Sequence, residues 1–515
     1  MTSLQRLLPG RDSVPLFDSA ESREIERAAL ASTAPNALME AAGMAVARLA
    51  LALAPHAERI WIAAGPGNNG GDGLVAARHL HQWGKQVHVT WQGDPARLPA
   101  DAANAREAAL AVGLTLHPPL SLPGQSGPGP QLCIDALLGL GQQRAAEGEM
   151  AATIAALNSW GRGGATLLAV DLPTGLSADT GRRLGDAVVE ADATLALLTP
   201  KPGLFTAEGR DAAGQVWWDC LGIDLGSRVS NTRLSGCDEA RSAHSPRLEA
   251  GHASHKGRFG DAWVVGGAPG MNGAAHLAAR ASLRAGAGRV YLTALSDQAH
   301  SPAACEIMER PWAAAHAAHL ADEATVVCGC GGGEAVRRVL PELLARARRL
   351  VLDADALNAI ATDTSLATLL EARGRRAEPT ILTPHPLEAA RLLDSTAAKV
   401  QSDRLAAARA LSGRFAAVVL LKGSGSVIAT PGRPTIVNST GNARLATAGT
   451  GDVLAGWIGG CWSSHAGNDL ATAGLVAVGS AWLHGWAVQD LDAGLPLPAG
   501  QLVDVMARAA DKLGR

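Results

Sequence analysis

Aromatic side chains are scarce in this sequence: Trp, Tyr and Phe together make up 3% of its 515 residues. Charged residues are also few, at 18%, and they nearly balance, with a formal net charge of −3 at pH 7. This near-neutral charge argues against a general binder of nucleic acid or of anionic membranes. Because hydrophobic residues still make up 47% of the chain, it can bury real cores, and these must be aliphatic and closely packed.

Cysteine pairs and long apolar runs are also missing. Seven cysteines, an odd number with no CxxC pair, predict neither a disulfide framework nor a zinc site; Cys328 and Cys330 are too close for the usual zinc spacing. The start, MTSLQRLLPGRDSVPLF, has no apolar run long enough for a signal peptide. The uncharged stretch between Asp469 and Asp490 indicates a buried helix rather than a membrane span. We therefore expect a cytoplasmic protein that binds neither membrane nor nucleic acid.

Short apolar runs alternate with longer amphipathic ones, a pattern typical of βαβ units and mainly parallel sheets. This rhythm stops in a polar segment without period, which predicts domains at 1–225 and 251–515 joined by a linker at 226–250. Residues 1–56 are predicted as helices after an N-terminal tail. Strands are expected at 59–65, 86–91, 132–135, 166–170, 193–198, 261–266, 289–294, 324–328, 349–353, 379–382, 416–421 and 424–429.

A glycine-rich segment, GPGNNGGDG at residues 65–73, lies between a predicted strand and a helix predicted from about Leu74 to Trp83. Glycine lets a backbone approach an anionic ligand, and the helix N-terminus that follows favours phosphate. A plain turn would not need the side-chain oxygens of Asn68, Asn69 and Asp72, which suit a cation or a ribose. The segment therefore indicates a ligand-binding loop.

Two further predicted strands of the first domain end on carboxylates, Asp135 in IDALLG and Asp171 in DLPTG. Ligands of open α/β sheets bind outside the carboxyl ends of the strands, so all three segments are expected to converge on one site. Taken singly, each aspartate is equally well explained as a helix or turn cap. Their convergence is what favours a functional role.

These three segments, with LMEAAG at 38–43 and TPKPG at 199–203, resemble the NAD(P)H-hydrate epimerase domain over roughly residues 15–225. The resemblance implies a Rossmann-like three-layer α/β fold and an acid/base role for Asp171, whose presence argues against the family's non-catalytic scaffolds. It implies that potassium is ligated by Asn69, Asp135 and Thr174, the last of which is Ser in many members. The residues implied to hold the hydrated dinucleotide are Asn68, Asn69, Gly70, Gly71, Asp72, Gly139, Leu140, Gly141, Gln142, Gln143, Arg144, Ala145 and Asp171.

In the second domain, Gly449, Thr450 and Gly451 precede a predicted helix. Their free backbone N–H groups form an anion hole for a transferring phosphoryl group. Asp452, in the first turn, is placed to take a proton from a hydroxyl nucleophile. Alone, this aspartate would be better explained as a capping acid, but the Lys-Gly-Ser-Gly turn upstream favours catalysis.

Three other polar residues of this domain have two interpretations each. His385, between two prolines and near Glu388, is either structural or a ligand contact. Asp353 and Asp355 either hold a magnesium–phosphate group or are solvated turn carboxylates.

The segments HKGRFG, GGAPGMNGAA, DADALN, TPHPLE and GTGDVLAG resemble the ADP/ATP-dependent NAD(P)H-hydrate dehydratases, which have a ribokinase-like α/β fold, over about residues 245–510. The family loop usually reads Gly-Pro-Gly-Leu-Gly where this chain has Gly-Cys-Gly-Gly-Gly at 329–333, so we expect a less rigid loop with the same backbone contacts. The contacts implied for the hydrated dinucleotide are Ala274, Gly331, Gly333, His385 and Asp452. Those implied for ADP with Mg²⁺ are Lys422, Gly423, Ser424, Gly425, Ser426, Gly449, Thr450 and Gly451.

Both resemblances imply the same substrate, hydrated NADH and NADPH. The expected protein is a bifunctional repair enzyme whose first domain interconverts the two epimers and whose second dehydrates the S form, converting ADP to AMP and phosphate. Family ribokinase-like units commonly assemble, so a homo-oligomer is expected. The alternatives are a small-molecule alcohol kinase fused to a non-catalytic dinucleotide-binding module, and a non-enzymatic scaffold.

Overall fold

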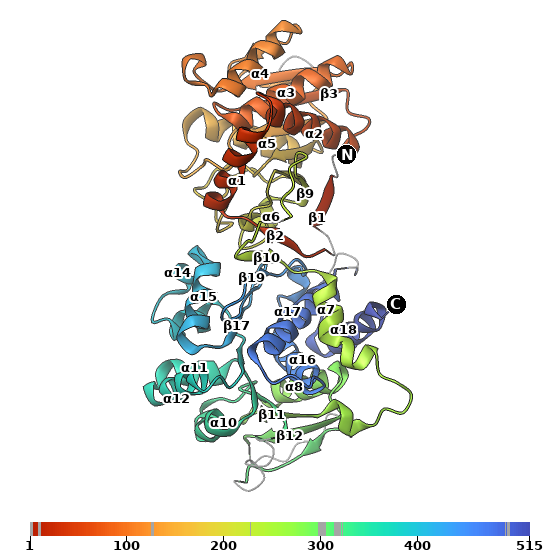
Figure 1. Ribbon diagram of the computed structural model, residues 1–515, viewed down its shortest axis with the longest axis vertical. Coiled ribbons are helices and arrows are strands. Elements are labelled where there is room, and N and C mark those ends of the chain that lie inside the picture. Colours follow the sequence, from red (N-terminus) through yellow and green to blue (C-terminus); the bar gives the residue numbers. More distant parts are fainter. Residues whose placement is uncertain are drawn as a thin grey trace. The chain divides into compact units, whose positions relative to one another are not determined.

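The computed structural model describes residues 4–8, 12–124, 128–226, 228–296, 305–313, 321, 323–489, 491 and 495–514. The chain forms two compact units, made chiefly of Pro15–Thr232 and of Arg233–Arg515. In Figure 1 the first unit runs from red to yellow-green and the second from green to blue. Each unit is a sheet covered by helices on both faces, as the sequence predicts.

The first unit is built on an eight-stranded sheet with the order β1-β9-β8-β7-β6-β3-β4-β5. All neighbours are parallel except β1 and β9. From β3 the chain runs outward through β4 and β5 and then returns to β6 on the other side of β3, so the order reverses between β3 and β6. A ligand crevice is expected at such a reversal. The strands are β1 Gln5–Leu8, β3 Arg59–Ala64, β4 Gln86–Trp91, β5 Leu116–His117, β6 Leu132–Ala136, β7 Thr166–Val170, β8 Ala193–Leu197 and β9 Gln215–Asp219.

Helices cover both faces of this sheet. On β3, Ile60 and Ile62 point into the core beneath α2 and α3, whereas Trp61 and Ala63 point into the core beneath α5. Such alternation is what a strand buried on both faces requires. The helices are α1 Ser19–Ser32, α2 Ala37–Leu53, α3 Asn68–Gln82, α4 Ala100–Ala111, α5 Gly148–Arg162 and α6 Gly209–Ala212.

The second unit is built on an eleven-stranded sheet with the order β13-β12-β11-β14-β15-β16-β17-β18-β19-β10-β2. Its strands are parallel from β13 to β17 and antiparallel from β17 to β19. The order reverses between β11 and β14. The strands are β2 Val14–Leu16, β10 Thr232–Leu234, β11 Asp261–Gly266, β12 Arg289–Ala294, β13 Met308–Glu309, β14 Thr325–Cys328, β15 Arg349–Leu352, β16 Thr380–Leu382, β17 Val418–Leu421, β18 Val427–Ala429 and β19 Thr435–Val437.

Two helical layers enclose the second sheet. Helices α8 and α16 approach closely: a Cβ on Gly456 would lie 2.1 Å from the carbonyl oxygen of Ala278, and one on Gly460 would lie 2.0 Å from that of Ser282. Glycine and alanine thus give the close packing that the composition implies. One layer contains α7 Cys237–Leu248, α8 Asn272–Ala285, α16 Thr450–Ser463, α17 Leu470–Trp486 and α18 Ala499–Leu513. The other contains α10 Leu340–Arg346, α11 Asp355–Thr362, α12 Thr364–Arg375, α13 Pro386–Leu392, α14 Ala397–Ser402 and α15 Arg404–Phe415.

The structure differs from the sequence-based prediction at the N-terminus and around the domain boundary. Strands β1 and β2 lie in the segment predicted as a tail with helices, and residues 226–250, predicted as a linker, contain β10 and α7. Helix α7 buries only small or polar side chains, Ala240, Ala243 and His244, in the second unit. It therefore has no visible apolar period in the sequence.

Among the described residues, no single helix is long and apolar enough to cross a membrane; α1 and α2 meet the criteria of length and composition only together, bent by 114°. The uncharged stretch after Asp469 forms α17, most of whose side chains are buried. The prediction of a buried helix is therefore confirmed, although Asp490 lies outside the described residues.

Candidate active sites

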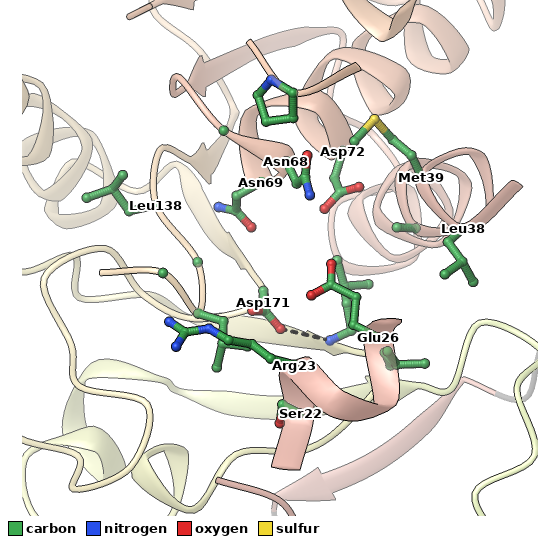
Figure 2. A pocket seen from close by; sticks show the side chains of 18 of the residues that line it. Ser22, Arg23, Glu26, Leu38, Met39, Asn68, Asn69, Asp72, Leu138 and Asp171 are labelled. Carbon is green, nitrogen blue, oxygen red and sulfur yellow. Dashed lines mark hydrogen bonds between the residues drawn. The ribbon is translucent and has the colours of Figure 1, made fainter. Parts of the chain in front are cut away.

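The first candidate site is a cavity of about 460 Å³ outside the carboxyl ends of β3, β6, β7 and β8, at the reversal of strand order (Figure 2). Its polar wall includes Asn68, Asn69, Asp72 and Asp171. Figure 2 shows the carboxyl groups of Asp72, Asp171 and Glu26 pointing into one space. The three segments predicted to converge therefore do so.

The glycine-rich segment is mostly helix rather than loop, because α3 begins at Asn68. A Cβ on Gly65 would lie 1.8 Å from the carbonyl oxygen of Leu137, and one on Gly70 would lie 2.0 Å from that of Gly65. A Cβ on Gly73 would lie 2.5 Å from the Cβ of Ala136. These glycines let α3 press against the strand ends, so the polar side chains of its first turn are held on a rigid element.

Asn69 has an unsatisfied donor. Its side chain is buried, and its Nδ2 has no hydrogen-bond partner among the described residues. Across from it, a Cβ on Gly139 would lie 3.0 Å from Asn69 Oδ1 and 3.2 Å from Asp171 Oδ2. Only a glycine leaves that space open, and a ligand there would meet both groups.

Asp135 and Thr174 form a buried pair below the cavity. Asp135 is 0% exposed and accepts hydrogen bonds from Thr174 N and Thr174 Oγ1, each at 2.8 Å, and from Leu137 N at 3.1 Å. Burial raises the pKa of Asp135 to about 6 although these bonds lower it. Among the described residues no positive side chain bonds to this buried carboxylate, and its neighbours include hydroxyl and amide oxygens, which is the donor chemistry that a hard cation needs.

Asp171 has a strained backbone, and a buried lysine holds its carboxylate. Its φ is +65°, in the left-handed region that non-glycine residues rarely adopt. Its Oδ1 accepts from Leu197 N at 3.2 Å and from the ammonium of Lys201, which also donates to Leu197 O at 2.9 Å. Because Lys201 is 3% exposed, this ion pair fixes the carboxylate at the cavity wall.

Two further carboxyl groups share the cavity with Asp171. Burial raises the pKa of Asp72 well above its usual range, and repulsion from Asp171 and Glu26 adds to the rise. Burial, then Asp171, also raises the pKa of Glu26. The cavity therefore holds carboxyl groups whose ionisation burial disfavours, a feature typical of sites of acid/base chemistry.

The second candidate site lies at the carboxyl ends of β14 to β17. Lys422 Nζ donates to Asp353 Oδ1 at 2.6 Å, and Thr383 Oγ1 donates to the same atom at 2.8 Å. One ligand atom from each of Cys330, Asp353 and Asp452 lies within 4.8 Å of the other two. Asp353 is 1% exposed, so it is not a solvated turn carboxylate.

Asp452 stands in the first turn of α16 beside a cation. Burial, then Asp353, raises its pKa to about 6. A Cβ on Gly451 would lie 3.3 Å from Lys422 Nζ, so this ammonium lies at the helix N-terminus, where Gly449 has a φ of +89°. The segment predicted as an anion hole therefore has a lysine and a carboxylate of raised pKa beside the N-terminus of α16.

Both units match protein families along their length. Residues 35–203 match the family described as YjeF-related protein N-terminus, and residues 262–499 match the family described as NAD(P)H-hydrate dehydratase. The chain is 38% identical over 467 residues to the bifunctional NAD(P)H-hydrate repair enzyme of Moorella thermoacetica, covering 83% of this chain and 82% of the relative. The chain belongs to the family of bifunctional NAD(P)H-hydrate repair enzymes.

Other relatives agree with this membership. The repair enzyme of Escherichia coli is 35% identical over 456 residues, covering 86% of this chain and 84% of the relative. Among solved structures, a Bacillus subtilis ADP/ATP-dependent NAD(P)H-hydrate dehydratase crystallised with ATP/Mg²⁺ has a TM-score of 0.43 and 26% identity. It covers 53% of this chain and 97% of that chain. The two family matches and the repair-enzyme relatives confirm both resemblances stated from the sequence.

Most of the residues predicted to contact the hydrated dinucleotide in the first unit of this repair-enzyme family member line the cavity. Gln142 also connects its own loop to the loop after β7, because its side chain accepts a hydrogen bond from Gly175 N at 2.6 Å and donates one to Pro173 O at 3.2 Å. Gly70 and Gly71 pack under the wall instead, and Gln143, Arg144 and Ala145 are not among its described lining residues. The lining residues from the prediction are Asn68, Asn69, Asp72, Gly139, Leu140, Gly141, Gln142 and Asp171.

In the second unit, His385 is both a cap and a candidate ligand contact. Its Nδ1 accepts from Leu387 N at 3.1 Å and Glu388 N at 3.3 Å, while Glu388 Oε2 accepts from His385 N at 2.7 Å. Burial lowers the pKa of His385 and raises that of Glu388 to about 7. Its Nε2 lies 3.2 Å from Glu388 Oε1, but the side chain is 45% exposed, so a ligand can still contact the ring.

The glycine loop after β14 and the turn after β17 are both fixed by charged side chains. Gly329, Gly331 and Gly333 have φ values of +118°, +59° and +50°, and Gly333 N donates to Asp355 Oδ2 at 2.9 Å. A Cβ on Gly331 would lie 3.0 Å from that of Ala274, which brings these two predicted contacts together. In the turn, Arg404 donates to Lys422 O at 3.2 Å. The other residues predicted to contact the nucleotide also make local contacts. Gly423 packs against Arg404, and Ser426 Oγ donates a hydrogen bond to Gly423 O, with Ser424 and Gly425 between them in the turn. Thr450 Oγ1 donates a hydrogen bond to Leu445 O.

Sequence reasoning missed Lys201, Glu26 and Arg404. Lys201 could have been noticed, because it is the one charge in the apolar run ALLTPKPGLF of a chain poor in charge. A lone lysine among buried residues predicts a buried acidic partner. Glu26 and Arg404 lie on ordinary polar helix segments, and no local signal distinguishes them.

Proposed function

We propose that the first unit interconverts the two epimers of hydrated NADH and NADPH, and that the second dehydrates the S form with conversion of ADP to AMP and phosphate. The observation that carries this proposal is the similarity to the bifunctional repair enzymes across both units, with a carboxylate–lysine pair in each crevice. The proposal includes a homo-oligomer in the cytoplasm, as the family resemblance implies. The same similarity gives no support to an alcohol kinase or a scaffold.

In the first unit, Asp171 would move the proton at the C6 hydroxyl of the hydrated ring. Lys201 supports this role because it holds the carboxylate in place and balances its charge in a buried wall. Asn69, Asp135 and Thr174 would hold a potassium ion. When bound, the ion would supply positive charge next to a buried carboxylate and hold oxygen atoms of the substrate.

In the second unit, Asp452 would take the proton of the C6 hydroxyl as its oxygen attacks the terminal phosphoryl group of ADP and AMP leaves. The N–H groups of Gly449 to Gly451 and the ammonium of Lys422 would hold the transferring phosphoryl group. Mg²⁺ bound with ADP would neutralise phosphate charge, with Asp353 and Asp355 as candidate carboxylate ligands. Loss of phosphate from the ring would then restore the reduced cofactor.

A mixture of both NADH-hydrate epimers tests the whole proposal. With ADP and Mg²⁺, the near-ultraviolet absorbance of the reduced nicotinamide should recover fully, because the first unit keeps supplying the S form. Recovery that stops when the S form is consumed would refute the epimerase assignment, and absence of recovery with either ADP or ATP would refute the dehydratase assignment.

Potassium is expected to stimulate epimerisation and not dehydration of the pure S form. Replacing K⁺ by tetramethylammonium, which is too bulky for the buried pair, should slow epimerisation by roughly 10–100-fold, the usual size of a disturbed metal site. The epimerisation rate is measured with the ADP-dependent step saturated. Asp135→Asn should remove the dependence on K⁺, because it removes the only charged member of the ligand set. Equal epimerisation rates in the two salts would contradict the site.

A further inference from the structure

Cys330 is the residue by which this chain departs most clearly from its family in the second crevice. It occupies the position where the family loop usually has proline, between Gly329 and Gly331. Its side chain is 0% exposed, and its Sγ lies within 4.8 Å of carboxylate oxygens of Asp353 and Asp452. A thiol thus reaches the two acids that the proposed reaction uses, where a proline would bring no donor atom.

We propose that Cys330, Asp353 and Asp452 form a binding site for a thiophilic divalent cation of the Zn²⁺ class. One sulfur and two carboxylate oxygens are three of the four ligands of a tetrahedral site, with the fourth position left for water. Sulfur ligands favour Zn²⁺, Cd²⁺ and Co²⁺ over Mg²⁺, which prefers an all-oxygen shell. The site is therefore distinct in chemistry from the magnesium that accompanies a nucleotide.

The hydrogen bonds of Asp353 leave one oxygen for a cation. Its Oδ1 is bonded to Lys422 and Thr383, whereas its Oδ2 accepts no hydrogen bond among the described residues. Oδ2 lies 4.0 Å from the Cβ position of Gly451, on the side of α16. The pair can thus keep its lysine and still offer a ligand atom.

Charge balance determines the strength of the site. On binding, the Cys330 thiol releases its proton to solvent, so thiolate and two carboxylates face a dication and the ammonium of Lys422. This makes the cluster neutral overall, but Lys422 repels the incoming cation directly. We therefore expect weaker binding than in a structural zinc site, and tighter binding when the lysine is removed.

Occupation of the site would inhibit dehydration. A cation bound to Asp452 lowers the basicity of the carboxylate that accepts the hydroxyl proton, and it occupies the space proposed for the phosphoryl group. Epimerisation in the first unit uses none of these residues. This functional consequence rests on the proposed dehydratase, whereas cation binding itself does not.

Cobalt binding to the full chain tests the site without any assay of activity. Cys220, Cys237 and Cys305, which are only partly buried or exposed, are first replaced by Ser to remove the more accessible thiols. Titration with Co²⁺ should then give one thiolate-to-cobalt charge-transfer band per chain. Cys330→Ala should abolish this band and weaken Co²⁺ binding by at least roughly 100-fold, because loss of a direct metal ligand lowers affinity more than loss of a residue that only supports a ligand.

Cys328→Ala is the matched control, because Cys328 is also fully buried but packs in the opposite core. It should keep the band. Lys422→Met should bind Co²⁺ more tightly, a gain that misfolding cannot produce. A band that survives Cys330→Ala, disappears equally in Cys328→Ala or weakens in Lys422→Met would overturn the proposal.

Zn²⁺ should also inhibit dehydration in the parent and not in Cys330→Ala; inhibition unchanged by Cys330→Ala would equally overturn it.

Discussion

Asp171→Asn is expected to stop epimerisation while leaving dehydration of the S form unchanged. The amide can still accept from Leu197 N, so the local fold should persist, but it cannot take a proton and no longer neutralises Lys201. Loss of a general acid/base typically costs 10²- to 10⁴-fold in rate, and about that loss is expected here. The measurement is cofactor recovery from a mixture of epimers with ADP, which should stop once the S form is used.

Two variants separate this role from a general loss of stability. Lys201→Met should slow epimerisation to a similar degree, because it leaves the Asp171 carboxylate buried without its cation. Asp192→Asn is the matched control: its carboxylate accepts from Leu167 N at 2.8 Å at the other end of the same sheet. Normal epimerisation by Asp171→Asn, or equal loss in Asp192→Asn, would show that the assignment is wrong.

The central strands of both sheets could be predicted because they are buried on both faces. Strands such as β3 and β14 are uninterrupted apolar runs followed by glycine, and this pattern is strong even in a single sequence. The last three strands at one side of the second sheet, β19, β10 and β2, are three residues long each and carry no such signal. Their pairing depends on partners distant in sequence, as when Ser13 Oγ donates to Leu234 O across 221 positions.

Site residues could be predicted where a sequence motif lies at the end of a strand. They could not be predicted where a helix distant in sequence supplies part of the cavity wall. Asp135 and Asp171 could be predicted because they stand at the carboxyl ends of strands, and Asp452 because it stands in the first turn of a helix. Glu26 enters the first cavity from α1, whose amphipathic pattern also fits a surface helix. Lys201 pairs with an acid 30 positions earlier, a contact that only the parallel neighbours β7 and β8 bring about.

Both crevices use the same electrostatic arrangement on unrelated loops. Each pairs a lysine with one carboxylate, the buried Lys201 with Asp171 and the partly buried Lys422 with Asp353, next to other carboxyl groups whose pKa is raised. In the first crevice the paired acid is the proposed acid/base. In the second the unpaired Asp452 has that role, while the paired lysine faces the helix N-terminus where phosphoryl charge is expected.

Asp469, at the start of the helix that follows α16, provides a control for the variant Asp452→Asn. Asp469 caps α17, accepting from Thr472 N at 2.7 Å, and this bond lowers the pKa of its carboxyl group. Since asparagine caps helices about as well as aspartate, Asp469→Asn should change neither dehydration nor stability appreciably. Any stabilisation seen with Asn at this position as well would be a general effect of charge removal.

Asp452→Asn is expected to abolish dehydration and at the same time make the protein more stable. Without a base for the hydroxyl proton, the rate should fall roughly 10²- to 10⁴-fold, measured as cofactor recovery from the pure S form. Burial raises the pKa of Asp452 to about 6, so above that pH the folded protein carries an unfavourable buried charge that Asn removes. The gain in the free energy of unfolding should be on the order of 1 kcal/mol after screening, largest at mildly alkaline pH, and should shrink as pH falls through about 6 toward the ordinary aspartate range.

By the same titration, the wild-type dehydration rate should fall as pH drops through about 6. An Asn variant that is less stable at alkaline pH, or a wild-type rate that rises on acidification, would contradict Asp452 as the buried base.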